Sequence, residues 1–152
     1  RSITITLADD KIRKIKTRII HSLLDRCYGT EPVDKKSDLL RKRINILSGN
    51  YPIMSNKGRN GTLKGGIYYS NRLVNNPGIF KEINLFLKKS MFSKSRNSFG
   101  MGMQSIPEHE KLEICNIDFK AGFQNKKYIN ISNQEMQEIK KCWEHKNHKK
   151  RR

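Results

Sequence analysis

The chain has 152 residues and a formal net charge of +18, because 32 lysines and arginines face only 14 aspartates and glutamates. Apolar residues make up 35% of the sequence, and no apolar run approaches the ~18–20 residues that a membrane span requires. The three cysteines are widely separated and odd in number, which argues against a disulfide framework. A charge this far from zero disfavours the compact state unless a polyanion is near, and nucleic acid is the polyanion that fits best.

Residues 2–7 alternate apolar and hydroxyl side chains, a pattern typical of a half-buried strand. One of the two aspartates that follow caps a predicted helix, which ends near Tyr28 and carries apolar residues at helical spacing. The remaining surface of this helix is basic and includes Arg13 and Lys16, which we expect to bind phosphate.

A second helix is predicted over residues 35–48, and a glycine-rich segment follows at 50–66. This segment has little apolar content and carries Lys57, Arg59 and Lys64. Glycine and positive charge together suit close approach of the backbone to phosphate, so we expect a mobile basic loop that binds nucleic acid.

The middle of the chain predicts a strand at 67–73 and a helix that starts at Asn76 or Pro77 and ends near 89. A loop at 90–105 follows, and its Lys94 and Arg96 are further candidates for phosphate contact.

Two more strands are predicted at 112–119 and 127–131. The residues 132–135 form a capping box that opens a last helix, in which Trp143 is expected to face the core. The final residues, 146–152, read as a basic tail.

Strands and helices in this order predict an α+β fold, a mainly antiparallel twisted sheet with helices packed on one face. We expect residues 1–145 to form a single RNA-binding domain, in which the basic helix at about 10–34 is an insertion.

Candidate catalytic groups are sparse. His109 lies between two glutamates, and His21 lies four residues before Asp25, but no second catalytic constellation accompanies either pair. The run 142–148 has C-x-x-H-x-x-H spacing, yet no further ligand pair completes a tetrahedral metal site. We therefore predict no enzymatic activity, no metal and no cofactor.

The stretch 46–59, Ile-Leu-Ser-Gly-Asn-Tyr-Pro-Ile-Met-Ser-Asn-Lys-Gly-Arg, resembles a helix end and turn in a known family. That family is the 5S-rRNA-binding ribosomal protein numbered five in the large subunit. Other segments resemble, in the family's order, a strand, a helix, a turn, and a closing strand and capped helix: 66–72, 79–86, 97–103, 114–119 and the helix from Ser132.

The resemblance implies a structural constituent of the ribosome in the central protuberance of the large subunit. Its partners would be 5S or large-subunit rRNA, and neighbouring ribosomal proteins of the central protuberance and the small-subunit head. Asn50 and Ser70 match positions that hydrogen-bond 5S rRNA, and Arg72 ends the same motif as Ser70. The loop at 57–65 matches one that reaches the elbow of the peptidyl-site tRNA.

The chain also differs from the family pattern, since it has an additional basic helix before Ser48 and a short loop at 59–65. Such differences favour an organellar ribosome and the mitochondrial matrix over another organellar or a cytosolic ribosome. A start at Arg1 is compatible with a cleaved transit peptide.

Two other functions stay open. A DNA-binding or nucleoid protein could place the basic helix at 10–28 in the major groove, although few asparagines or glutamines are available there to read bases. A small RNA-processing nuclease could use His109 or His21 with a nearby carboxylate.

Overall fold

The computed structural model describes residues 9–53 and 63–144. The strand predicted at 2–7, the side chains of Lys57 and Arg59, and the tail at 146–152 lie outside the described residues. The elements are α1 (Asp9–Tyr28), α2 (Val33–Leu47), β1 (Asn50–Ile53), β2 (Leu63–Gly66), the 3₁₀ helix η1 (Tyr69–Asn71), α3 (Gly78–Met91), α4 (Ser98–Ser105), α5 (Glu108–Cys115), α6 (Phe119–Gln124) and α7 (Asn133–Lys140). No helix among the described residues is both long enough and apolar enough to span a bilayer.

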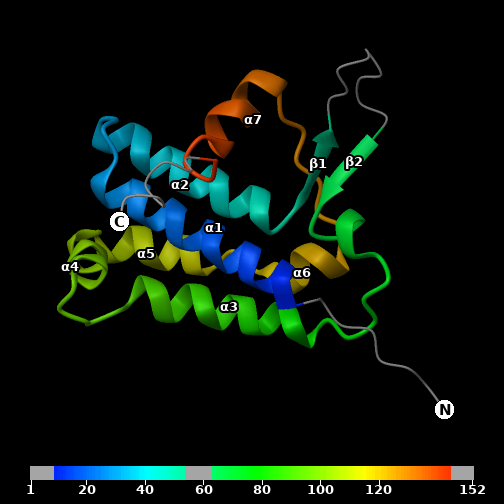
Figure 1. The fold of residues 1–152 in the computed structure, drawn as a ribbon, viewed down its shortest axis with the longest axis horizontal. Helices are drawn as coiled ribbons and strands as arrows, with labels where there is room; N and C mark the ends of the chain where they lie inside the picture. The colour runs from blue at the N-terminus through cyan, green and yellow to red at the C-terminus, as the bar shows by residue number, and fades with distance from the viewer. Residues whose placement is uncertain (1–8, 54–62, 145–152) are drawn as a thin grey trace.

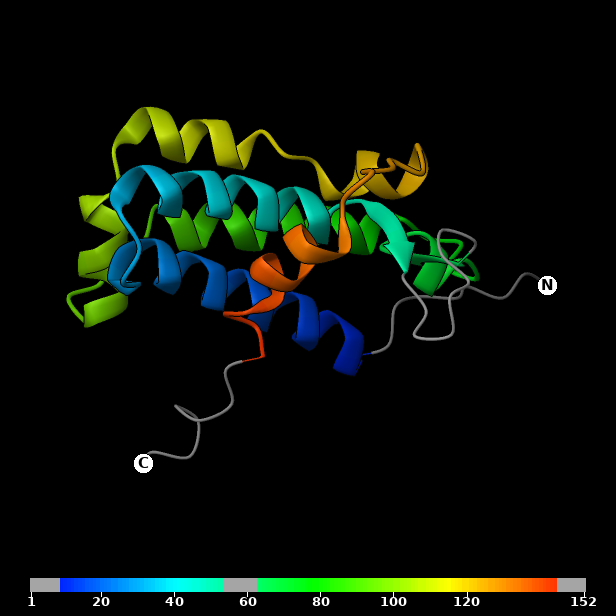
Figure 2. The same ribbon diagram turned by 90° about the horizontal axis from the view of Figure 1, so that it is seen from above.

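Four helices, α1, α2, α3 and α5, run roughly along the long axis and surround the core (Figure 1). Seen from above, α7 lies across the side of the molecule between α1 and α2 (Figure 2). α4 closes one end, whereas α6 and the β1–β2 hairpin lie at the other end (Figure 1). The two ends of the molecule are therefore built from different segments, and this separates the candidate binding residues described below.

The core forms because apolar side chains recur at helical spacing on the inner faces of these helices. Ile19 and Leu23 of α1 are fully buried, and the ring of Phe80 in α3 stacks on Phe123 in α6 with centroids 4.4 Å apart. Burial of a side chain of this size contributes about 1.5–3 kcal/mol. The fully buried large side chains are Phe80, Phe119, Ile19, Leu23, Leu40, Ile44, Ile83, Leu87, Met91, Met103, Ile114 and Ile139.

The helices predicted at 10–28, 35–48 and 76–89 are confirmed as α1, α2 and α3. The N-cap predicted at Ser132 is also confirmed, because its hydroxyl accepts a hydrogen bond from the backbone N–H of Glu135 at 3.1 Å, while the Glu135 carboxylate pairs with Lys42 at 2.8 Å. The helix that it opens is α7.

The predicted twisted sheet is wrong. Within the described residues, the sheet consists of β1 and β2 alone, paired antiparallel with Asn50 opposite Gly66 and Ile53 opposite Leu63. The fold is still a mixture of helix and sheet, but its helices pack mainly against one another and do not cover one face of a sheet.

The strand predicted at 67–73 is a turn followed by η1. The carboxamide oxygen of Asn50 accepts hydrogen bonds from the backbone N–H groups of Tyr68 and Tyr69 at 2.8 and 3.1 Å. Since those two N–H groups are already bonded, they cannot extend the β2 ladder.

The strand predicted at 112–119 is instead the end of α5 and the start of α6. Asp118 separates the two helices, and its carboxylate caps α6 by accepting a hydrogen bond from Ala121 N–H. The loop predicted at 90–105 contains α4, which Asn97 caps in the same way. The strand predicted at 127–131 is reduced to one parallel bridge between Tyr128 and Asn50.

Candidate nucleic-acid interface

Ion pairs with carboxylates are concentrated on one part of the described chain. Between residues 26 and 43 every basic side chain except Lys36 is paired with a carboxylate, whereas Lys36 donates to the backbone oxygen of Gly29. Farther along the chain, the Lys140 ammonium lies 4.0 Å from the Glu144 carboxylate. No carboxylate among the described residues pairs with the basic side chains of the first half of α1, of β2 or of the segment 68–72. The pairs between 26 and 43 are Arg26–Glu110, Lys35–Glu138, Arg41–Asp38, Arg41–Glu113, Lys42–Asp38, Lys42–Glu135 and Arg43–Asp25.

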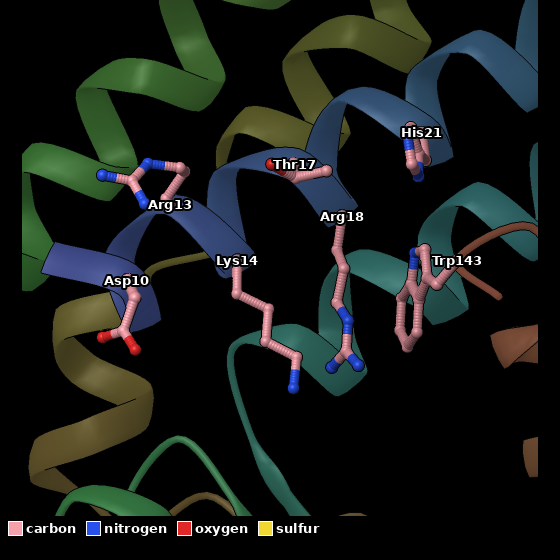
Figure 3. A pocket seen from close by; sticks show the side chains of 7 residues that line it. All are labelled: Asp10, Arg13, Lys14, Thr17, Arg18, His21 and Trp143. Atoms are coloured by element: carbon pink, nitrogen blue, oxygen red, sulfur yellow. The ribbon is translucent and has the colours of Figure 1, made fainter. Parts of the chain in front are cut away.

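A groove of about 290 Å³ runs along the first half of α1 (Figure 3). Asp10, Lys14 and Arg18 leave successive turns of the helix and point the same way, because residues four apart share a face. Arg13 also lines the groove and is exposed. The groove is thus lined by three basic side chains and one carboxylate, so it favours an anionic ligand.

Trp143 lies beside Arg18 in the same groove (Figure 3). The Arg18 guanidinium carbon is 5.2 Å from the indole centroid, within the range of a cation–π contact. The indole N–H donates to the Ser22 hydroxyl at 2.9 Å, and the side chain packs against both apolar clusters of the molecule. Trp143 is therefore a half-buried core residue with one edge at the groove.

Lys11 ties the start of α1 to η1. Its ammonium group donates to the backbone oxygen of Ser70 at 3.2 Å and to the side chain of Asn71 at 3.5 Å. Ser70 and Arg72 are both exposed. The fold thus brings Ser70 of the motif expected to bind rRNA next to the basic end of α1.

Asn50 cannot serve as a direct RNA contact in this structure, because its side chain is fully buried (0% exposed). In addition to the two hydrogen bonds that its oxygen accepts, its side-chain nitrogen donates to the backbone oxygen of Lys127 at 2.8 Å. The residue matched to an rRNA ligand is instead a structural junction of β1, η1 and the segment before α7.

Lys127 is also withdrawn from the surface. Its ammonium donates to the hydroxyl of Ser48 at 2.6 Å and to the carboxamide of Asn45 at 3.3 Å. Burial lowers the pKa of Lys127 below its ordinary value, because its surroundings disfavour the charged form. Asn50 and Lys127 together hold the base of the hairpin, and neither is available to a ligand.

Sequence reasoning missed three tyrosines at the base of the hairpin. Tyr68, Tyr69 and Tyr128, with Lys64 and Lys126, form what we call the tyrosine cluster. The Lys64 ammonium lies 5.7 Å from the Tyr69 ring centroid and 5.4 Å from that of Tyr128. The Lys126 ammonium lies 4.9 Å from the Tyr68 centroid. Lysine and tyrosine occur close together in the sequence at 64–69 and at 126–128, but nothing in the sequence placed the two segments together.

The other predicted residues do not join this surface. Lys94 and Arg96 are exposed between α3 and α4, a segment at the opposite end of the molecule from η1 (Figure 1). Lys16 is half-buried, and its ammonium lies 5.2 Å from the ring centroid of Phe86. The predicted residues therefore do not form one site. Arg13 lies on the first half of α1, whereas Lys64 lies in β2 of the hairpin and Ser70 and Arg72 follow it closely.

The candidate catalytic groups are held in structural contacts. Glu110 is buried, and its carboxylate accepts two hydrogen bonds from the Arg26 guanidinium at 2.7 and 2.8 Å. Those bonds hold the pKa of Glu110 below its ordinary value. Asp25 accepts from Arg43 at 2.7 Å, while His109 is exposed on α5. Neither carboxylate is placed as a free general base.

No group of three or more histidine, cysteine or acidic side chains suited to a metal ion occurs within residues 9–53 and 63–144. Burial raises the pKa of the Cys142 thiol to about 11. The two histidines of its run, at 145 and 148, lie outside the described residues.

Comparison with known proteins finds no matching family model, no matching curated protein and no matching solved structure.

Proposed function

We propose that this chain binds RNA as a structural constituent of the large ribosomal subunit, in the central protuberance of a mitochondrial ribosome. The observation that carries the RNA-binding part is the division of its basic residues. Carboxylates pair with most cations of α2 and with Arg26 at the end of α1, while the exposed cations of early α1 and the hairpin form no ion pair with a described carboxylate.

The ribosomal part of the proposal is supported by segments that resemble the 5S-rRNA-binding protein in the same order along the chain. They include the helix end and turn at 46–59, the helix at 79–86 and the capped helix from Ser132. The segments at 66–72 and 114–119 give no such support, because neither forms the strand that the family would have there.

The mechanism is electrostatic and positional. Arg13 and Lys14 on α1 would neutralise phosphates and release their counterions. Ser70 and Arg72 would contact sugar or phosphate beside them. Because Asn50 is buried, it supports this surface from below and takes no part in contacting rRNA. The partners remain large-subunit rRNA, 5S rRNA where the ribosome has it, the tRNA elbow and neighbouring ribosomal proteins.

The test is crosslinking of the tagged protein in cells, followed by sequencing of the attached RNA and gradient sedimentation. We expect reads from the central protuberance region of mitochondrial large-subunit rRNA or from 5S rRNA, and co-migration with the large subunit. Scattered DNA targets, together with sedimentation lighter than that of a ribosomal subunit, would instead indicate a nucleoid protein. RNA cleavage that His109→Ala abolishes would replace it with a nuclease.

A further inference from the structure

The tyrosine cluster is built from two segments more than fifty positions apart in the sequence, and one buried side chain joins them. Asn50 binds the backbone N–H groups of Tyr68 and Tyr69 through its oxygen. Through its side-chain nitrogen and its backbone it also binds the segment that carries Tyr128: its side-chain and backbone N–H groups both donate to Lys127 O at 2.8 Å, and its backbone oxygen accepts from Ile129 N–H at 2.7 Å. Asn50 thus holds together the two backbone segments that carry the three tyrosines.

The outer side of the cluster combines aromatic surface with positive charge. Tyr128 is 43% exposed, and Lys64 and Lys126 are both exposed. Tyr68 and Tyr69 meet edge to face, with centroids 5.3 Å apart and planes at 85°. The two ammonium groups lie over the rings and are not paired with any carboxylate in the described part of the chain. They are therefore free to meet phosphate next to an aromatic face.

Lys126 has a backbone conformation that seldom suits lysine. Its φ is +52°, in the left-handed region where glycine is the usual residue at the end of a helix, and it follows α6 directly after the C-cap Asn125. A side chain here costs conformational energy that glycine would avoid. In this backbone conformation the Lys126 ammonium lies over the ring of Tyr68.

We propose that the tyrosine cluster is a stacking site for unpaired nucleotides of RNA, an inference that rests on the proposed function and specifies it. Bases stack on tyrosine faces without regard to sequence, while nearby lysines bind the backbone. In duplex RNA the base faces are already stacked inside the helix, so the cluster selects single-stranded segments such as loops and bulges. The basic groove of α1 then binds phosphates of any RNA, and the cluster supplies the preference for unpaired strands.

The test compares three fluorescent probes by anisotropy titration: an oligouridine of about 12 nucleotides, the same strand with abasic sites, and a duplex of equal length. We expect the wild-type protein to bind the oligouridine more tightly than the abasic strand. Tyr128→Ala should weaken oligouridine binding about 10-fold and leave abasic and duplex binding unchanged. Tyr128→Phe, which keeps the ring, should bind like the wild type.

Lys126→Gly supplies a second variant that is safe for folding, because glycine is favoured at a positive φ. Loss of one phosphate contact should lower the slope of log affinity against log salt for the oligouridine by about 0.7. Tyr128→Ala should leave that slope unchanged, since it removes no charge. Circular dichroism and Trp143 fluorescence check that both variants are folded.

The outcomes separate the two proposals. If the wild-type protein binds none of the three probes, the proposed RNA-binding function fails. If it binds the duplex as tightly as the oligouridine, and Tyr128→Ala has no effect on either, the stacking site is refuted while RNA binding stands.

Discussion

At the scale of single residues, Asn50 was expected to contact rRNA, but in this structure it is a buried residue that joins backbone segments. Its carboxamide satisfies two backbone N–H groups and one backbone oxygen from segments that no regular ladder joins. An unpaired buried donor costs about 1–3 kcal/mol, so the junction depends on this side chain more than on the two short strands. Any influence of Asn50 on RNA binding would therefore act through the residues that it positions.

We expect Asn50→Ala to lower the free energy of unfolding by about 3 kcal/mol, because Tyr68 N–H and Tyr69 N–H lose their acceptor. Urea unfolding of the RNA-free protein measures this change in the free energy of unfolding. Ser70→Ala is the control, because Ser70 is exposed and its side chain makes no hydrogen bond with another described residue. Its change in stability should stay within about 0.5 kcal/mol. Equal stability of Asn50→Ala and the wild type would contradict the structural role.

The buried pair of Arg26 and Glu110 predicts how stability depends on pH. Hydrogen bonds from Arg26 hold the folded-state pKa of Glu110 below its ordinary value of about 4.3. The stability that the pair contributes is therefore complete above that ordinary value and is lost as the pH falls through the lowered one.

Glu110→Gln should cost about 3 kcal/mol near neutral pH, since it leaves the buried Arg26 charge without a carboxylate. The difference from the wild type should narrow as the pH falls below the ordinary value, because the unfolded chain then binds a proton at Glu110 that the folded protein does not. Urea unfolding at about pH 7 and about pH 3 measures both differences. The matched control is Glu113→Gln in the exposed pair with Arg41, with a cost below about 1 kcal/mol. A difference for Glu110→Gln that does not change with pH would argue against the pair.

At the scale of elements, the long helices could be predicted and the sheet could not. α1, α2 and α3 carry apolar residues at helical spacing over several turns, which few other structures satisfy. The segments at 67–73 and 112–119 are short, and their alternation of apolar residues also fits a turn or a helix end. The first segment is decided by a distant acceptor, the side chain of Asn50. At the second, Asp118 caps α6 locally, and distant Asn84 bonds both the Asp118 carboxylate and Phe119 N–H.

The candidate site, too, could be predicted from the sequence only in part. Exposed cations such as Arg13, Lys64 and Arg72 could be predicted, because charged side chains rarely become buried. The burial of Asn50 and the tyrosine cluster could not, because both depend on the segment at 126–129 returning to the hairpin. The spacing of residues within either segment does not predict the contact between the two segments.

A buried guanidinium group contributes to the docking of α7, beside the ion pairs from Lys35 and Lys42 and the apolar contacts of Met136 and Ile139. The side chain of Arg43 is 3% exposed, and it donates to Asp25 at 2.7 Å, to the backbone oxygen of Ile139 at 2.9 Å and to that of Glu138 at 3.3 Å. The planar fork of arginine reaches three acceptors in different directions, which the single ammonium of lysine cannot do.

We expect Arg43→Lys to reduce the free energy of unfolding by about 1–3 kcal/mol and to loosen α7. Trp143 follows α7 and is the single tryptophan, so its emission should shift to longer wavelength as the indole becomes more hydrated. Lys140→Gln, in the long pair with Glu144, should change neither quantity. Unaltered emission and stability in Arg43→Lys would show that the apolar contacts and the ion pairs from Lys35 and Lys42 hold the helix without the guanidinium.

At the scale of the whole molecule, the charge of +18 is not spread evenly. Carboxylates gather around α2, where they offset its cations, and leave the first half of α1 and the base of the hairpin strongly positive. An excess of charge on one face costs stability in the free protein and is offset when phosphates bind. The face formed by α1 and the hairpin, and not the total charge, is therefore what we expect RNA to recognise.

The most direct test of this account measures RNA affinity against salt for two double variants that lower the charge equally. Arg13→Gln with Lys14→Gln removes cations of the α1 groove, and Lys35→Gln with Lys42→Gln removes cations already paired with carboxylates. For a duplex probe we expect the slope of log affinity against log salt to fall by about 1.8 in the first variant and to stay nearly unchanged in the second. Equal reductions in both would mean that RNA responds only to net charge, and would contradict the account.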